Sequence, residues 1–101
     1  MDHPLTDLMT EIRSLMDEKG FSSHESRIWE LFALLHSEIS EAVDAYRKGD
    51  SYEDVGWELT DTLIRLLHLM SIIGQDPDKL YRKVMESNRS RPPRWNSVRG
   101  G

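Results

Sequence analysis

Apolar residues recur every three or four positions through most of this chain, and this spacing constrains the fold more than any other feature. Residues with this period share one side of an α-helix. The first such segment, near residues 5–18, is followed by Gly20, a typical helix stop, and it contains Leu5, Leu8, Met9, Ile12, Leu15 and Met16. No segment shows a convincing strand pattern. The sequence therefore predicts an all-α fold.

A second helix is predicted from about Ser26 to Lys48, with Ser23 or Ser26 as its N-terminal cap. Lys48-Gly49-Asp50 ends this helix. Its apolar stripe, which we expect to face the core, consists of Ile28, Phe32, Leu35, Ile39, Val43 and Tyr46.

The third helix, about residues 52–73, begins after Ser51, which forms a capping-box pattern with Asp54. It is apolar nearly all round, so we expect it to be the most buried element. Asp76 and Pro77 then provide the cap and first position of a fourth helix, which runs to about Ser90. Four helices are expected.

The length of 101 residues suits one small domain, predicted over residues 1–92, with a basic C-terminal tail at 93–101. Charged residues make up 31% and hydrophobic residues 38%, without a stretch long and apolar enough for a membrane span. The start of the chain lacks the pattern of a signal peptide, and cysteine is absent, so we expect a cytoplasmic protein without membrane association. A core this small favours self-association.

The net charge of −5 is unevenly distributed. Residues 82–101 hold six basic side chains and one acidic side chain, a net charge of +5, while the remainder carries −10. An acidic body argues against binding of a nucleic-acid polymer by the whole domain. The basic segment suits the phosphate groups of a small ligand.

Two acid pairs stand out, Glu38 with Glu41 and Glu58 with Asp61, each three residues apart. Residues at this spacing are neighbours on a helix surface. Helical projection places both pairs at the border of the predicted apolar stripes, so antiparallel helices would bring them together. Four converging carboxylates repel one another unless they are protonated or bind cations, and Mg²⁺ prefers such oxygen ligands. The alternative is that the acids are merely solvated.

A di-iron carboxylate bundle is a competing metal site, but it requires histidine three residues after glutamate. Neither His36 nor His68 has this spacing. Trp29, one helical turn before Phe32, is a candidate for stacking on a nucleobase, although aromatic residues at this spacing usually belong to a core.

The order of these motifs resembles the MazG-like family of all-α nucleotide pyrophosphohydrolases. The similarity covers about residues 28–92, and it is carried by Glu38, Glu41, Glu58, Asp61, Lys83, Asn88, Arg91 and Pro92. It implies a four-helix bundle of the MazG-like type, completed by assembly into a homodimer or homotetramer. Two departures are Ser37, where many members have glutamate, and Arg65, at an often aromatic position.

The resemblance implies cleavage of a nucleoside triphosphate between its α and β phosphates, giving a monophosphate and pyrophosphate, as in removal of unwanted nucleotides. The four acids would bind Mg²⁺, with Mn²⁺ as a substitute, and one of them, such as Glu41, would be the general base. Lys83, Asn88 and Arg91 would contact the substrate, and Arg65 would either pair with Asp61, which we favour, or reach a phosphate. Two alternatives are a phosphoribosyl-ATP pyrophosphohydrolase and a non-catalytic helical dimer that binds a protein partner.

Overall fold

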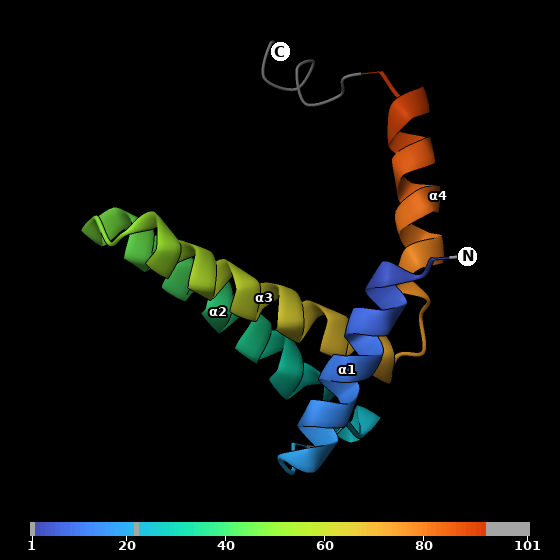
Figure 1. Cartoon of the computed structure of the whole chain (residues 1–101), viewed down its shortest axis with the longest axis horizontal. Coiled ribbons are helices and arrows are strands. Elements are labelled where there is room, and N and C mark those ends of the chain that lie inside the picture. The colour runs from blue at the N-terminus through green and yellow to red at the C-terminus, as the bar shows by residue number, and fades with distance from the viewer. Residues whose placement is uncertain (1, 22, 93–101) are drawn as a thin grey trace.

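The computed structural model describes residues 2–21 and 23–92, and every regular element in them is helical (Figure 1). The α-helices are α1 (Pro4–Glu18), α2 (Ile28–Lys48), α3 (Tyr52–Ile72) and α4 (Pro77–Ser90), and a 3₁₀ turn, η1 (Glu25–Arg27), precedes α2. The predictions of an all-α fold and of four α-helices are confirmed. The predicted tail at 93–101 lies outside the described residues.

The α2 and α3 helices form a long antiparallel hairpin, α1 packs across α3, and α4 leads away from the hairpin (Figure 1). The hairpin turn has the predicted signals. Gly49 ends α2 with a φ of 81°, a left-handed conformation that glycine adopts without strain. The Ser51 hydroxyl accepts a hydrogen bond from the Asp54 N–H at 3.1 Å and caps α3.

The start of α2 differs from the prediction, because neither Ser23 nor Ser26 caps it. The helix is preceded by Arg27, whose side chain makes no capping hydrogen bond. The capping group belongs instead to η1, where His24 Nδ1 accepts from the Ser26 N–H at 3.1 Å. Ser23 is unavailable as a cap because its hydroxyl hydrogen-bonds to His68 on α3.

The predicted apolar stripe on α2 is wrong at Phe32, which is 41% exposed, and over its second half. Ile39, Val43 and Tyr46 are 46%, 47% and 66% exposed, whereas Ala42 and Ala45 are buried. The reason is that α2 has apolar residues on two sides. The buried alanines permit close packing of the helix backbones, whereas the larger residues lie at an exposed edge of the hairpin, beside Val55 and Leu59 of α3.

The α3 helix has the largest share of buried and half-buried residues, as predicted, but parts of it remain exposed. Its buried side chains, Leu67, His68 and Leu69, lie near its C-terminal end, while Leu59 and Leu63 are 55% and 44% exposed. The radius of gyration is 16.3 Å, compared with about 13 Å for a compact chain of this length. A single chain therefore leaves much of its apolar surface uncovered. No helix among the described residues combines the length and hydropathy needed to span a bilayer.

The junction between α1 and α4 depends on Asp78, a buried carboxylate at the start of α4. Its Oδ1 and Oδ2 accept hydrogen bonds from the backbone N–H groups of Leu5 and Thr6, at 3.1 and 2.8 Å. Burial alone would raise the pKa of Asp78, but hydrogen bonding by the Thr6 side chain and by these two backbone N–H groups outweighs it and holds the pKa below its usual value. Asp78 thus caps a helix more than 70 residues away in the sequence.

We expect Asp78→Ala to lower the midpoint of thermal unfolding by roughly 5 °C, because two N–H groups of α1 lose their acceptor. Circular dichroism during heating measures this change. Glu86→Ala, at an exposed position on the same helix, is the control and should leave the midpoint nearly unchanged. Equal midpoints for the two variants would contradict the assigned role of Asp78.

Candidate metal centre

A line of polar residues runs along α3, although most of this helix is apolar. It comprises Glu58, Asp61, Arg65, His68 and Ser71, which are spaced so that they follow one side of the helix. All five are buried or half-buried. This side of α3 therefore requires compensating partners from α1 and α2.

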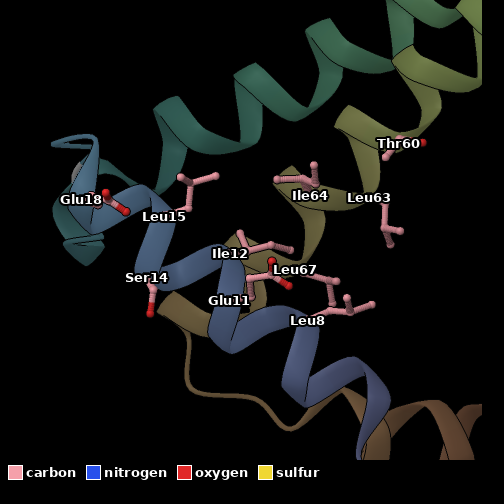
Figure 2. Close-up of a pocket in the computed structure, with 10 residues that line it drawn as sticks. All are labelled: Leu8, Glu11, Ile12, Ser14, Leu15, Glu18, Thr60, Leu63, Ile64 and Leu67. Atoms are coloured by element: carbon pink, nitrogen blue, oxygen red, sulfur yellow. The ribbon is translucent and has the colours of Figure 1, made fainter.

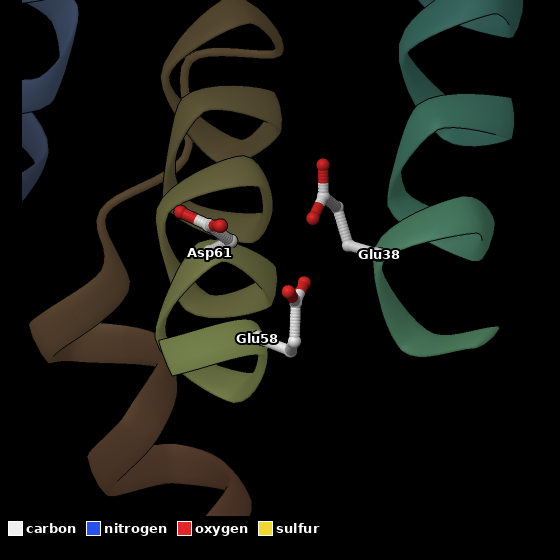
Figure 3. A group of neighbouring side chains, drawn as sticks. All are labelled: Glu38, Glu58 and Asp61. Carbon is white, nitrogen blue, oxygen red and sulfur yellow. The ribbon is translucent and has the colours of Figure 1, made fainter. Parts of the chain in front are cut away.

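Three carboxylates meet between α2 and α3. One oxygen from each of Glu38, Glu58 and Asp61 lies within 4.8 Å of the others, and each residue is half-buried. Glu38 projects from α2 toward α3, which carries the other two (Figure 3). The predicted convergence of acids from two helices is thus present in these three side chains.

Glu41, the fourth predicted acid, is exposed but belongs electrostatically to the same cluster. Burial is the largest cause that raises the pKa of Glu38 and of Glu58 above the usual value. The negative charges of Glu41 and Asp61 raise both pKa values further. The cluster therefore holds more negative charge than its surroundings neutralise.

Arg65 lies beside this cluster, but its partner is not the predicted one. Its Nε lies 3.7 Å from Glu38 Oε1, so the ion pair crosses from α3 to α2 and does not involve Asp61. The guanidinium carbon also lies 5.9 Å from the centre of the Phe21 ring. A helical turn separates Arg65 from Asp61 in sequence, yet the side chain extends toward the facing helix.

The donor set suits a hard divalent cation. It consists of carboxylate oxygens alone, the ligands that Mg²⁺ and Mn²⁺ accept, without the histidine or cysteine typical of zinc sites. A bound cation would also relieve the repulsion that raises the pKa values of Glu38 and Glu58. Exposed acids are often solvated without a metal, so the half-burial of these three is the informative feature.

The predicted substrate-binding residues of α4 do not join the carboxylates in the described chain. Lys83, Asn88 and Arg91 are exposed, and α4 leads away from the hairpin that carries the acids (Figure 1). Arg91 and Asn88 contact each other instead, with Arg91 Nη2 donating to Asn88 Oδ1 at 2.5 Å. These residues can act at the cluster only if α4 moves or belongs to another copy of the chain.

Two shallow grooves lie along α3, and one of them includes a residue of the cluster. The smaller, about 460 Å³, contains Trp57 and Asp61. It shares Thr60 and Ile64 with a larger groove of about 690 Å³ between α1 and α3, which is mostly apolar (Figure 2). Trp57 was not among the predicted ligand contacts, but its position four residues before Asp61 would have placed the two on one helix face.

Trp29, the predicted stacking residue, is 81% exposed at the start of α2. Its ring centre lies 6.0 Å from that of Phe32. The two rings thus form an aromatic pair at the surface of α2, a geometry consistent with their spacing in the sequence.

The far end of the polar line is a hydrogen-bonded network around His68, which is only 2% exposed. Ser23 Oγ donates to Asp17 Oδ1 and contacts His68 Nε2, both at 3.1 Å. A neutral imidazole that donates from Nε2 to Ser23 satisfies both contacts. Burial is the main cause that lowers the pKa of His68, and the positive charges of Arg13 and Arg65 lower it further.

Comparison with known proteins adds no relative. No family model matches the chain, and neither a curated protein nor a solved structure is significantly similar to it.

We expect stability to fall as the pH drops below about 6.5, because the unfolded His68 imidazole binds a proton there that the folded protein excludes. One such group contributes at most about 1.4 kcal/mol per pH unit. Above this pH, His68 is neutral in both states and contributes no slope. Urea unfolding between pH 5 and 8 should show a shallower acid-side slope for His68→Gln than for the wild type.

His36→Gln, an exposed histidine on α2, is the control for loss of an imidazole. It should retain the wild-type slope. If both variants and the wild type lose stability in parallel, the buried imidazole is not the source of the pH dependence.

Proposed function

We propose that the protein is a Mg²⁺-dependent nucleoside triphosphate pyrophosphohydrolase, which cleaves between the α and β phosphates. The observation that carries the proposal is the cluster of Glu38, Glu58 and Asp61, with oxygens within 4.8 Å of one another between two helices. The proposed reaction is inferred from the order of the motifs, which resembles that of the MazG-like family. The same resemblance suggests a cytoplasmic enzyme that removes unwanted nucleotides. Mn²⁺ is the expected substitute metal.

Each acid has a role that follows from its position. Glu38, Glu58 and Asp61 would hold the metal, because their oxygens already converge. Glu41 is exposed beside them, so it is accessible to water and suited to accept a proton from the attacking nucleophile. Bound Mg²⁺ would supply charge neutralisation for the phosphates and a lowered pKa for coordinated water.

The substrate would enter from the grooves along α3. Phosphates belong at the carboxylate cluster through the metal, and the nucleoside belongs on the apolar side that begins at Trp57. We therefore propose Trp57 as a stacking residue in addition to Trp29. Lys83, Asn88 and Arg91 would reach the phosphates from the α4 helix of a second copy.

We expect the purified protein to release pyrophosphate from at least one nucleoside triphosphate in millimolar Mg²⁺. Addition of a chelator should stop this release. Glu58→Gln and Asp61→Asn should each reduce this rate at least about 100-fold, because a metal ligand is lost. A coupled pyrophosphate assay over a broad substrate panel, which includes phosphoribosyl-ATP, measures this. Asp44→Asn is the matched control, since Asp44 is an exposed acid on α2, three residues beyond Glu41.

The non-catalytic alternative predicts a different set of results. A helical dimer that binds a protein partner would release no pyrophosphate from any substrate, and Mg²⁺ would not raise its melting temperature. A ligand that binds only the folded state must raise that temperature with increasing concentration. Absence of both effects would contradict the proposed hydrolase.

We also propose that the protein is a homodimer or homotetramer. The support is the apolar surface that one chain leaves exposed, including a patch on the hairpin lined by Ile39, Ala42, Val43, Tyr46, Val55 and Leu59. Monomeric proteins rarely leave large contiguous apolar patches exposed. The open shape of the chain is consistent with a fold that a second copy completes.

We expect analytical ultracentrifugation at micromolar concentration to give a dimer or tetramer, and Val43→Glu to shift it toward monomer. Val43 is half-exposed, so the charge would oppose association without entering the core of the single chain. Arg47→Glu, one turn further and outside the apolar patch, is the control. A well-folded wild-type monomer would contradict the proposal.

A further inference from the structure

Arg65 is the one arginine in the polar line on α3, and it lies in an unfavourable environment. Its side chain is 21% exposed and that of Glu38 is 16% exposed, so the ion pair between them is largely shielded from water. The separation of 3.7 Å is too long for a good hydrogen bond. The pair is therefore held by charge and not by ideal geometry.

A second nitrogen of this guanidinium is also poorly satisfied. Arg65 Nη1 is buried and makes no hydrogen bond to any described residue. A buried donor without an acceptor destabilises the folded state, so an apolar residue would suit this position better unless the charge itself is needed. The nearby carboxylates provide that need, because Arg65 Nε lies 3.7 Å from Glu38 Oε1 and its positive charge offsets part of the negative charge of the cluster.

We propose that Arg65 is a built-in counterion of the carboxylate cluster, which stabilises the metal-free protein and competes with Mg²⁺ for Glu38. This inference rests on the proposed function, because it assumes that the cluster binds Mg²⁺. Arg65 is a positioning residue and not a catalytic one, since its contacts are with Glu38 and Phe21. Its charge makes the affinity of the site for Mg²⁺ weaker than the carboxylates alone would give.

The contact with Phe21 makes it feasible for Mg²⁺ to replace Arg65 as the partner of Glu38. The guanidinium carbon lies 5.9 Å from the Phe21 ring centre, within the range of a cation–π interaction. This contact does not depend on Glu38. When Mg²⁺ binds Glu38, Arg65 can therefore lose its ion pair and still keep the contact with the Phe21 ring.

The test is a Mg²⁺ titration of thermal stability without nucleotide, in the wild type, Arg65→Met and Arg65→Lys. Arg65→Met fills a similar volume without charge, so its metal-free form should melt at a lower temperature than the wild type. Its affinity for Mg²⁺ should be about three- to tenfold tighter, because one positive charge no longer repels the cation. Screening by water and salt keeps this change small. Arg65→Lys keeps the charge and should bind Mg²⁺ within about twofold of the wild type.

The control is Arg47→Met, which removes an exposed arginine of α2 and should leave the affinity for Mg²⁺ unchanged. A purely structural Arg65 would lower the melting temperature of Arg65→Met equally with and without Mg²⁺. Unchanged or weaker Mg²⁺ binding in this variant overturns the inference while the proposed function stands. If the wild type itself shows no response to Mg²⁺, the proposed function fails together with the inference.

If Arg65→Met does not fold without metal, Arg65→Gln takes the place of Arg65→Met in the titration. Glutamine keeps hydrogen-bond donors at this position. The expected direction is the same, because glutamine is also uncharged. Mg²⁺ binding by Arg65→Gln that is no tighter than in the wild type would overturn the inference.

Discussion

Repulsion among like charges on α2 and α3 is the constraint around which this small protein is organised. Glu38, Glu58 and Asp61 are half-buried between the helices, where water compensates their charges less well than at an open surface. Arg65 offsets part of that charge from the same helix. The repulsion that remains would be relieved either by protonation of a carboxylate or by a bound cation.

The elements were predictable because the signals for them are local. Ser51 caps α3, Asp76 caps α4 and Gly49 ends α2, each through contacts with residues a few positions away. Which face of α2 would be buried was not predictable in the same way. Both faces are apolar, and the choice of the face with Ala42 and Ala45 depends on how closely α3 can approach.

In the site, too, local features were predictable from the sequence and contacts between helices were less so. Spacing within each helix was sufficient to pair Glu58 with Asp61, and two antiparallel helices brought Glu38 to them. The partner of Arg65 could not be read from spacing, because a long side chain on α3 can reach either its own preceding turn or the facing helix. Nor does the sequence reveal that α4 leads away from the hairpin, since the start of α4 contacts α1 through Asp78, a contact between residues far apart in the chain.

That contact has a consequence for the order of folding. The α2–α3 hairpin joins residues close in sequence, so its closure costs little chain entropy. The capping of α1 by Asp78, by contrast, joins positions separated by more than 70 residues and cannot form until the intervening chain is compact. A nascent chain would thus assemble its acidic cluster first, and the two terminal helices would dock together as a late step.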